Sequence, residues 1–215
     1  CAGRLRSPDA PELWRMLSRL AAGKQTEPER LAEIASRIAA DRSLEIARAA
    51  TNPVPGEGNP DADLLFVGEA PGAQEDREGR PFVGAAGRFL EEMLSSIGLT
   101  RRDVFITNVV KYRPPGNRDP EPAEIEACWP YLEEQISAID PALIITLGRH
   151  AMNRFLEGEL ISRIHGQPKR KEGRVYYPLY HPAAALYNGS MREVLLNDFS
   201  RIPKILKKIN EVAET

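Results

Sequence analysis

The sequence is poor in the features that mark several protein classes. It contains 2 cysteines in 215 residues, and two cysteines cannot form the disulfide framework of a small secreted domain. No apolar run approaches the roughly 20 residues that span a bilayer, and no charged-then-apolar leader is visible. We therefore expect a cytoplasmic protein that has no membrane partner.

An excess of charge of one sign is also missing. The formal net charge is −2, which argues against a non-specific nucleic-acid binder that acts through a basic tail but leaves room for a local basic face. With 42% hydrophobic residues, a chain of 215 residues is long enough for one α/β domain with a substantial core. It is too short for two domains of ordinary size. We expect a monomer. Because the chain begins at Cys1 rather than methionine, we expect a partial sequence; a mature bacterial lipoprotein is the alternative.

The first 50 residues have the pattern of two helices. Apolar side chains recur there at helical spacing. They are Leu13, Met16, Leu17 and Leu20, followed by Leu31, Ile34 and Ile38. Thr26 and Glu29 fit a capping box at the start of the second helix. Residues 51–60 contain too many prolines and glycines for regular structure, so we expect an extended connector.

The rest of the chain alternates between short apolar runs and amphipathic helices. The runs at residues 64–67, 104–107, 143–147 and 175–179 read as buried strands. Helical patterns lie between and after them, at residues 86–97, 120–139, 151–156 and 192–209. Strand, helix and strand in this order predict a parallel sheet with right-handed crossovers.

Polar side chains follow the ends of three predicted strands. Glu69, Glu75 and Asp76 lie in a glycine-rich loop after the first strand, Asn108 ends the second, and His181 follows the fourth. Because the carboxyl ends of parallel strands share one edge, these groups should gather at a ligand pocket. A turn asparagine and a satisfied buried histidine are the alternatives. Phe82, between a proline and glycines, is either a ligand-stacking ring or a core plug.

Several of these motifs together resemble one family. They are GEAPG (68–72) with Glu75 and Asp76, GRPFVG (79–84), TNVVK (107–111), RPPGNR (113–118) and the pair His181-Pro182. In order and spacing, from about Val54 to Leu206, the chain resembles the uracil-DNA glycosylases of the fourth, iron–sulfur type. The resemblance implies a three-layer α/β/α fold with a central four-stranded parallel sheet, and excision of uracil from single- or double-stranded DNA. The chain then divides into a helical extension (1–50) and a glycosylase-like domain (51–215).

The resemblance also implies roles for the pocket residues. Phe82 stacks on a base flipped out of the DNA. Asn108 accepts from uracil N3–H and donates to O4, a pattern that cytosine reverses. Glu69 lies near the C5 edge of the base, where a thymine methyl group would collide.

Further groups are expected at the scissile bond. His181 stabilises charge at uracil O2, with backbone N–H groups near Ala70 and Pro71 in support. Glu75 orients water or faces the sugar cation, and Asp76 is the second choice for this role.

A DNA-contacting surface is implied next to the pocket. Lys111, Arg113, Asn117 and Arg118 would contact phosphates that flank the flipped nucleotide; the alternative is a solvated loop with ordinary charges. Pro182 and Leu186 follow His181, and Leu186 either wedges into the base stack or begins the core face of a helix.

The chain departs from the family at its cofactor. The family's cluster needs four thiolates. Here residues 39–44 contain no cysteine, Tyr112 occupies the third position, and only Cys128 remains. We therefore expect no iron–sulfur cluster, and no other cofactor, with Cys128 a small buried hydrophobe.

Two other functions stay open at this point. Glu69, Glu75 and Asp76 could hold Mg²⁺ in a metal-dependent hydrolase. The chain could also be a catalytically idle DNA-binding relative. Among glycosylase substrates, hypoxanthine or another deaminated base is an alternative to uracil.

Overall fold

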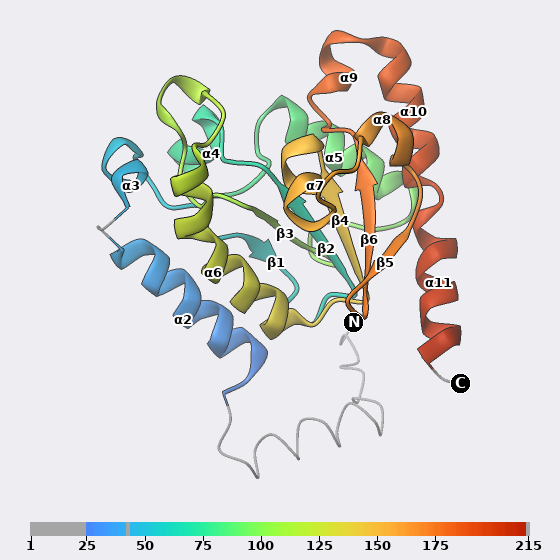
Figure 1. Ribbon diagram of the computed structural model, residues 1–215, viewed down its shortest axis with the longest axis horizontal. Coiled ribbons are helices and arrows are strands. Elements are labelled where there is room, and N and C mark those ends of the chain that lie inside the picture. Colours follow the sequence, from blue (N-terminus) through green and yellow to red (C-terminus); the bar gives the residue numbers. More distant parts are fainter. Residues whose placement is uncertain (1–24, 42–43, 214–215) are drawn as a thin grey trace, which may run out of the picture.

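The computed structural model describes residues 25–41 and 44–213 (Figure 1). Its centre is a sheet of order β1-β3-β2-β4-β6-β5. The four inner strands are mutually parallel. They are β3 (Phe105–Asn108), β2 (Leu64–Gly68), β4 (Leu143–Leu147) and β6 (Arg174–Leu179). The predicted four-stranded parallel sheet is therefore confirmed as the core of a larger sheet.

Two short antiparallel strands extend the sheet at its edges. They are β1 (Glu57–Gly58), which pairs with β3, and β5 (Lys169–Lys171), which pairs with β6. The sequence did not predict either, because one has two residues, the other has three, and neither contains the apolar residues that mark a buried strand. The connector expected at residues 51–60 thus includes an edge strand.

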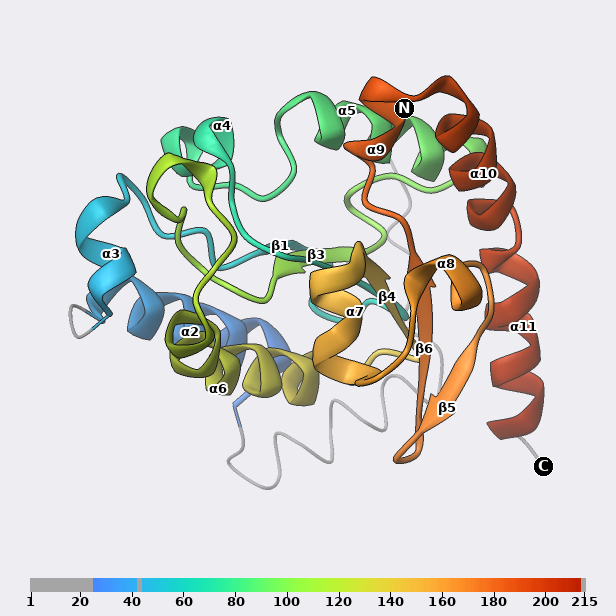
Figure 2. The ribbon, with the colours of Figure 1, turned by 45° about the horizontal axis from the view of Figure 1, so that its top comes forward.

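Helices cover both faces of the sheet, as Figure 2 shows. One face packs against α2 (Glu27–Ala40), α3 (Glu45–Ala49), α6 (Pro122–Ile139) and α7 (Arg149–Phe155). The other packs against α5 (Ala85–Ser96), α10 (Gly189–Phe199) and α11 (Ile202–Ala213). Leu65 and Val67 of β2 belong to the first core, while Leu64 and Phe66 belong to the second. Both faces of the strand are buried, and the three-layer α/β/α architecture is confirmed.

Some helix boundaries differ from the expectation. The predicted closing helix is two helices, which Ser200 and Arg201 separate. Helix α6 begins at Pro122 instead of Pro120, because Glu121 and Glu124 form a capping box there. The remaining helices are α4 (Ala73–Glu78), the 3-10 turn Pro115–Asn117, α8 (Ile161–Ile164) and α9 (Ala184–Tyr187).

Helix α2 is part of the core rather than an appendage. The predicted capping box at its start is confirmed, with Thr26 and Glu29 each accepting from the other's backbone N–H. Its buried Leu31, Ile34 and Ile38 pack in the same apolar cluster as β2 and α6. The helix expected around Leu13 lies outside the described residues, and the domain boundary at residue 50 stays a prediction. Within the described chain, no helix has the length and apolar character needed to cross a membrane.

Candidate active site

The carboxyl ends of β2 and β3 bring Asn108 and Phe82 together. Gly68 of β2 pairs with Asn108 of β3 in the sheet register. A Cβ atom on Gly68 would lie 2.3 Å from Asn108 Oδ1 and 2.7 Å from the Phe82 ring. Real Cβ atoms do not make such contacts, so a glycine is required where the two side chains meet.

Phe82 lies between the core and His181. Its side chain is 5% exposed and belongs to the apolar cluster under α5. Its ring stacks on the imidazole of His181, with ring centroids 5.7 Å apart and an interplanar angle of 29°. The core-plug interpretation fits the apolar cluster on one side of Phe82, and the ligand-stacking role stays a prediction.

His181 is held as a neutral hydrogen-bond donor. The backbone N–H of Ala183 donates to Nδ1 over 3.1 Å, so in the neutral ring the hydrogen is on Nε2. Burial lowers the pKa of His181 to about 4, although the nearby Glu75 carboxylate opposes this shift. At neutral pH the imidazole thus offers an Nε2–H group without carrying a positive charge.

Asn108 has an unsatisfied oxygen. The residue is 2% exposed, and within the described part of the chain its Oδ1 has no hydrogen-bond donor. A buried acceptor left without a donor costs about 1–3 kcal/mol. Such an atom indicates a position where a ligand with an N–H group completes the hydrogen bonding.

The two carboxylates of α4 have different surroundings. Glu75 Oε1 accepts from the backbone N–H groups of Val83 and Gly84, both over 2.9 Å. Asp76 is 4% exposed, and its Oδ1 accepts from the N–H groups of Thr51 and Asn52 over 2.8 and 3.1 Å. Asp76 therefore anchors the connector, while Glu75 keeps its second oxygen for other partners. The second-choice catalytic role of Asp76 does not fit this anchoring contact.

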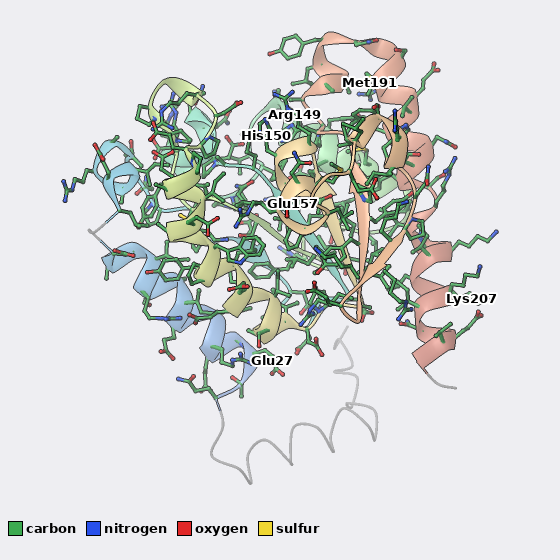
Figure 3. The ribbon with its side chains drawn as sticks, in the orientation of Figure 1. Glu27, Arg149, His150, Glu157, Met191 and Lys207 are labelled. Carbon is green, nitrogen blue, oxygen red and sulfur yellow. The ribbon has the colours of Figure 1, made fainter. Side chains whose placement is uncertain are left out.

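Glu69 lies beside two residues that sequence reasoning missed. Glu69 Oε1 is 4.0 Å from Nδ1 of His150, whose Nε2 is 3.5 Å from Asp119. Burial raises the pKa of Glu69, and His150 partly offsets the rise. Figure 3 labels His150 with Arg149, which donates to the His150 ring over 3.0 Å. His150 follows the carboxyl end of β4, and this position in the sequence could have identified it as a candidate site residue.

This group bears on the metal-dependent alternative. In the described chain, Glu69, Asp119 and His150 form the group of three side chains whose potential metal-ligand atoms all lie within 4.8 Å of one another. The expected trio of Glu69, Glu75 and Asp76 does not form such a group, and backbone N–H groups engage one oxygen each of Glu75 and Asp76. The magnesium interpretation of that trio was wrong.

Comparison with known proteins agrees with this geometry. The family model of the uracil DNA glycosylase superfamily matches residues 55–209. The chain belongs to this superfamily. The resemblance read from the motifs is thereby confirmed.

Three relatives illustrate the range of the match. A Type-4 uracil-DNA glycosylase of Sulfurisphaera tokodaii is 49% identical over 195 residues, which cover 86% of each chain. One of Archaeoglobus fulgidus is 48% identical over 189 residues, covering 84% of this chain and 95% of the relative. A DNA polymerase of Bacillus phage SP01 is 30% identical over 156 residues, which are 72% of this chain and 17% of the polymerase.

The superfamily loop after β3 differs from the expectation at Lys111. This side chain is fully buried, and its Nζ donates to Thr107 Oγ1, the Asn108 carbonyl and Gln135 Oε1 over 2.8, 2.7 and 2.7 Å. Burial lowers the pKa of Lys111 to about 7. The expected phosphate contact was wrong, because the ammonium points into the protein and supports the backbone at Asn108.

Among the other expected DNA contacts, Asn117, Arg118 and Leu186 are exposed and Arg113 is half-buried. Arg113 Nε donates to Asn117 Oδ1 over 2.7 Å, while Arg118 pairs with Glu124 over 2.7 Å and so has its charge compensated. Leu186 is 45% exposed and its neighbour Tyr187 is 90% exposed. Leu186 is thus not a core residue, and its wedge role stays a prediction.

Three expected site residues have no contact that defines a role. Ala70 is half-buried, and Pro71 and Pro182 are buried. Their parts in substrate binding and DNA contact stay predictions.

The corner between α2 and α6 lacks the donors for a cluster. Cys128 is fully buried and is the one cysteine among the described residues. Tyr112 is 2% exposed, and its hydroxyl donates to the Ile38 carbonyl near the end of α2. Nearby, the Tyr131 hydroxyl donates to Asp41 over 2.7 Å. A cluster held by four thiolates does not fit this set of side chains.

Proposed function

We propose that the protein is a uracil-DNA glycosylase, which hydrolyses the N-glycosidic bond of uracil in DNA, leaves an abasic site and so starts base excision repair. The observation that carries the proposal is the unsatisfied Asn108 Oδ1 beside Phe82 and a neutral His181. Together these groups form an acceptor, an aromatic face and a donor, the three contacts that an extruded uracil needs.

Binding selects the base by its hydrogen-bonding edge. Uracil N3–H donates to Asn108 Oδ1 and uracil O4 accepts from Nδ2, whereas cytosine offers an acceptor at N3 and a donor at N4. A bidentate pair of this kind discriminates by about 1–3 kcal/mol. The base stacks on the ring of Phe82, with His181 beside it. Glu69 lines the C5 edge and excludes a thymine methyl group.

Cleavage separates charge that two side chains stabilise. As the C1′–N1 bond breaks, its electron pair stays on uracil, and the Nε2–H of His181 donates to O2 where negative charge develops. The second carboxylate oxygen of Glu75 orients a water molecule toward C1′ and faces the positive sugar. Water supplies the hydroxyl group to C1′ and the proton to the departing base.

DNA is held beside this pocket. Arg113 and Asn117 contact backbone phosphates and thereby position the strand without reading its sequence. Leu186, exposed on α9 next to the His181 loop, enters the space that the flipped nucleotide leaves. We infer that uracil is recognised in single- and double-stranded DNA by a monomeric, cytoplasmic enzyme.

The enzyme works without an iron–sulfur cluster. The sequence holds 2 cysteines, too few for four thiolates, and the buried Tyr112 hydroxyl bonds to helix α2 where the family's third thiolate is expected. No step of the proposed reaction needs a metal ion.

A panel of oligonucleotides tests this proposal. Purified protein is incubated in a chelator with single- and double-stranded DNA containing uracil, hypoxanthine or a thymine mispair, and alkali-labile sites are counted. We expect cleavage at uracil. Cleavage at hypoxanthine alone would change the substrate, binding without cleavage would favour the idle DNA-binding relative, and loss of cleavage in the chelator would favour a metal-dependent hydrolase.

A further inference from the structure

Phe82 has a backbone conformation that an aromatic residue rarely adopts. Its φ angle is +52°, in the left-handed region where a side chain clashes with its own backbone. Such a residue persists only where its surroundings over-determine it. The contacts that hold residues 81–84 therefore help to shape the pocket that binds the base.

Arg101, in the loop between α5 and β3, makes the contacts on one side of this turn. Its Nη1 donates to the Phe82 carbonyl over 2.9 Å and its Nη2 to the Pro81 carbonyl over 2.5 Å. Its Nε and Nη2 donate to Glu57 Oε1 over 2.9 and 2.5 Å. The Arg101 side chain is 14% exposed. One guanidinium thus links two successive carbonyls of the turn to a carboxylate on β1.

The other side of the turn is held by Glu75 and α5. Glu75 Oε1 accepts from the next two backbone N–H groups, those of Val83 and Gly84. A Cβ atom on Gly87 would lie 1.8 Å from the Phe82 carbonyl oxygen, so α5 packs directly against that peptide. The carbonyls are fixed by Arg101 and the N–H groups by Glu75.

We propose that Arg101 is a positioning residue that keeps Phe82 in its left-handed conformation and so pre-forms the stacking face for the flipped base. This inference rests on the proposed glycosylase function. A lysine cannot replace Arg101, because only the planar fork of a guanidinium reaches two carbonyls and a carboxylate at once. Without it, Phe82 relaxes to a negative φ angle and a smaller fraction of molecules has a competent pocket.

The test compares Arg101→Met and Arg101→Lys with the neighbouring exposed Arg102→Met, each alone and with Phe82→Ala. Arg102→Met removes the same charge without touching the turn. We expect both Arg101 variants to lower kcat/KM by roughly 10-fold or more, mainly through KM, because the competent fraction divides the affinity. In the Phe82→Ala background the same changes should cost less than about twofold, since coupled residues are not additive.

Each outcome decides between alternatives. An Arg101→Lys variant with wild-type KM would overturn the proposal, and so would an Arg101→Met effect of equal size with and without Phe82. If Arg101→Met does not fold, two milder variants replace it: Arg101→Lys keeps the charge, and Glu57→Gln keeps the shape of the side chain. Their KM values then show whether the contacts of Arg101 position Phe82. If wild-type protein excises no base at all, the proposed function fails rather than the role of Arg101.

Discussion

The pocket at the carboxyl ends of the strands follows the family pattern, whereas the corner between α2 and α6 departs from it at the cysteines. At the pocket, Asn108 has a buried oxygen that no donor among the described residues contacts. At the corner, the hydroxyl of the buried Tyr112 has an acceptor and Cys128 packs as a hydrophobe. A buried polar atom without a partner needs an explanation, and at the pocket a bound base would supply the missing donor, whereas the satisfied groups at the corner need no ligand. We therefore assign the pocket residues to catalysis and the corner residues to the stability of the fold.

The largest expected effect is at His181. Changing His181→Ala should lower the single-turnover rate of uracil excision by about 10²–10³-fold, because one hydrogen-bond donor to a developing oxyanion is lost. Melting temperature should fall little, and the measurement is a rapid-quench time course on saturating DNA. A variant with nearly wild-type rate would remove His181 from the mechanism.

Asn108 should show activity and stability moving in opposite directions. The change Asn108→Leu removes the unsatisfied oxygen, so the free energy of unfolding should rise by up to about 1–3 kcal/mol while uracil excision is lost. Urea denaturation and the excision assay measure the two effects. A variant that loses both stability and activity would mean that Asn108 serves the fold.

At the corner, the expected effect is on stability alone. Tyr112→Phe removes the hydrogen bond to the Ile38 carbonyl and should cost about 0.5–1.5 kcal/mol of unfolding free energy, with excision unchanged. Thermal denaturation measures the loss. An excision rate that falls with Tyr112→Phe would show that the two regions are coupled.

Lys111 hydrogen-bonds to residues of both regions, and the pH dependence of stability tests whether its amine is buried. Its pKa is about 7 in the folded protein and near 10.5 in the unfolded chain. Between these values the unfolded chain holds one more proton, so stability should rise as pH increases from 7 to 10.5. Below pH 7 both states are protonated and this contribution is constant. Urea denaturation across this range should lose the rise in Lys111→Met, and an unchanged slope would contradict the burial of the amine.

The smallest effects are expected on the DNA-contacting loop. Arg113→Ala should weaken binding to all sequences and lower the salt dependence by about one unit of slope, as one phosphate contact is lost. Arg118→Ala should change it less, because Glu124 already pairs with Arg118. Fluorescence anisotropy at several salt concentrations measures both slopes, and equal slopes would contradict the pairing.

The pocket residues could be predicted from the sequence more fully than the residues that hold the pocket in place. Asn108 and His181 could be placed together because each follows a buried apolar run and parallel strands end at one edge. Lys111 could not, since its burial depends on Gln135, which lies 24 residues away on α6. The sequence analysis singled out neither Arg101 nor Glu57, because they are 44 residues apart and no motif connects them.

Excision of uracil without an iron–sulfur cluster can be tested by the excision rate of protein whose iron content has been determined, before and after chelation, with Asn108→Leu as the control. We expect abasic sites at uracil, a rate that does not depend on iron or chelator, and no cleavage by the control. Excision that scales with bound iron, or that persists unchanged in Asn108→Leu, would contradict this expectation.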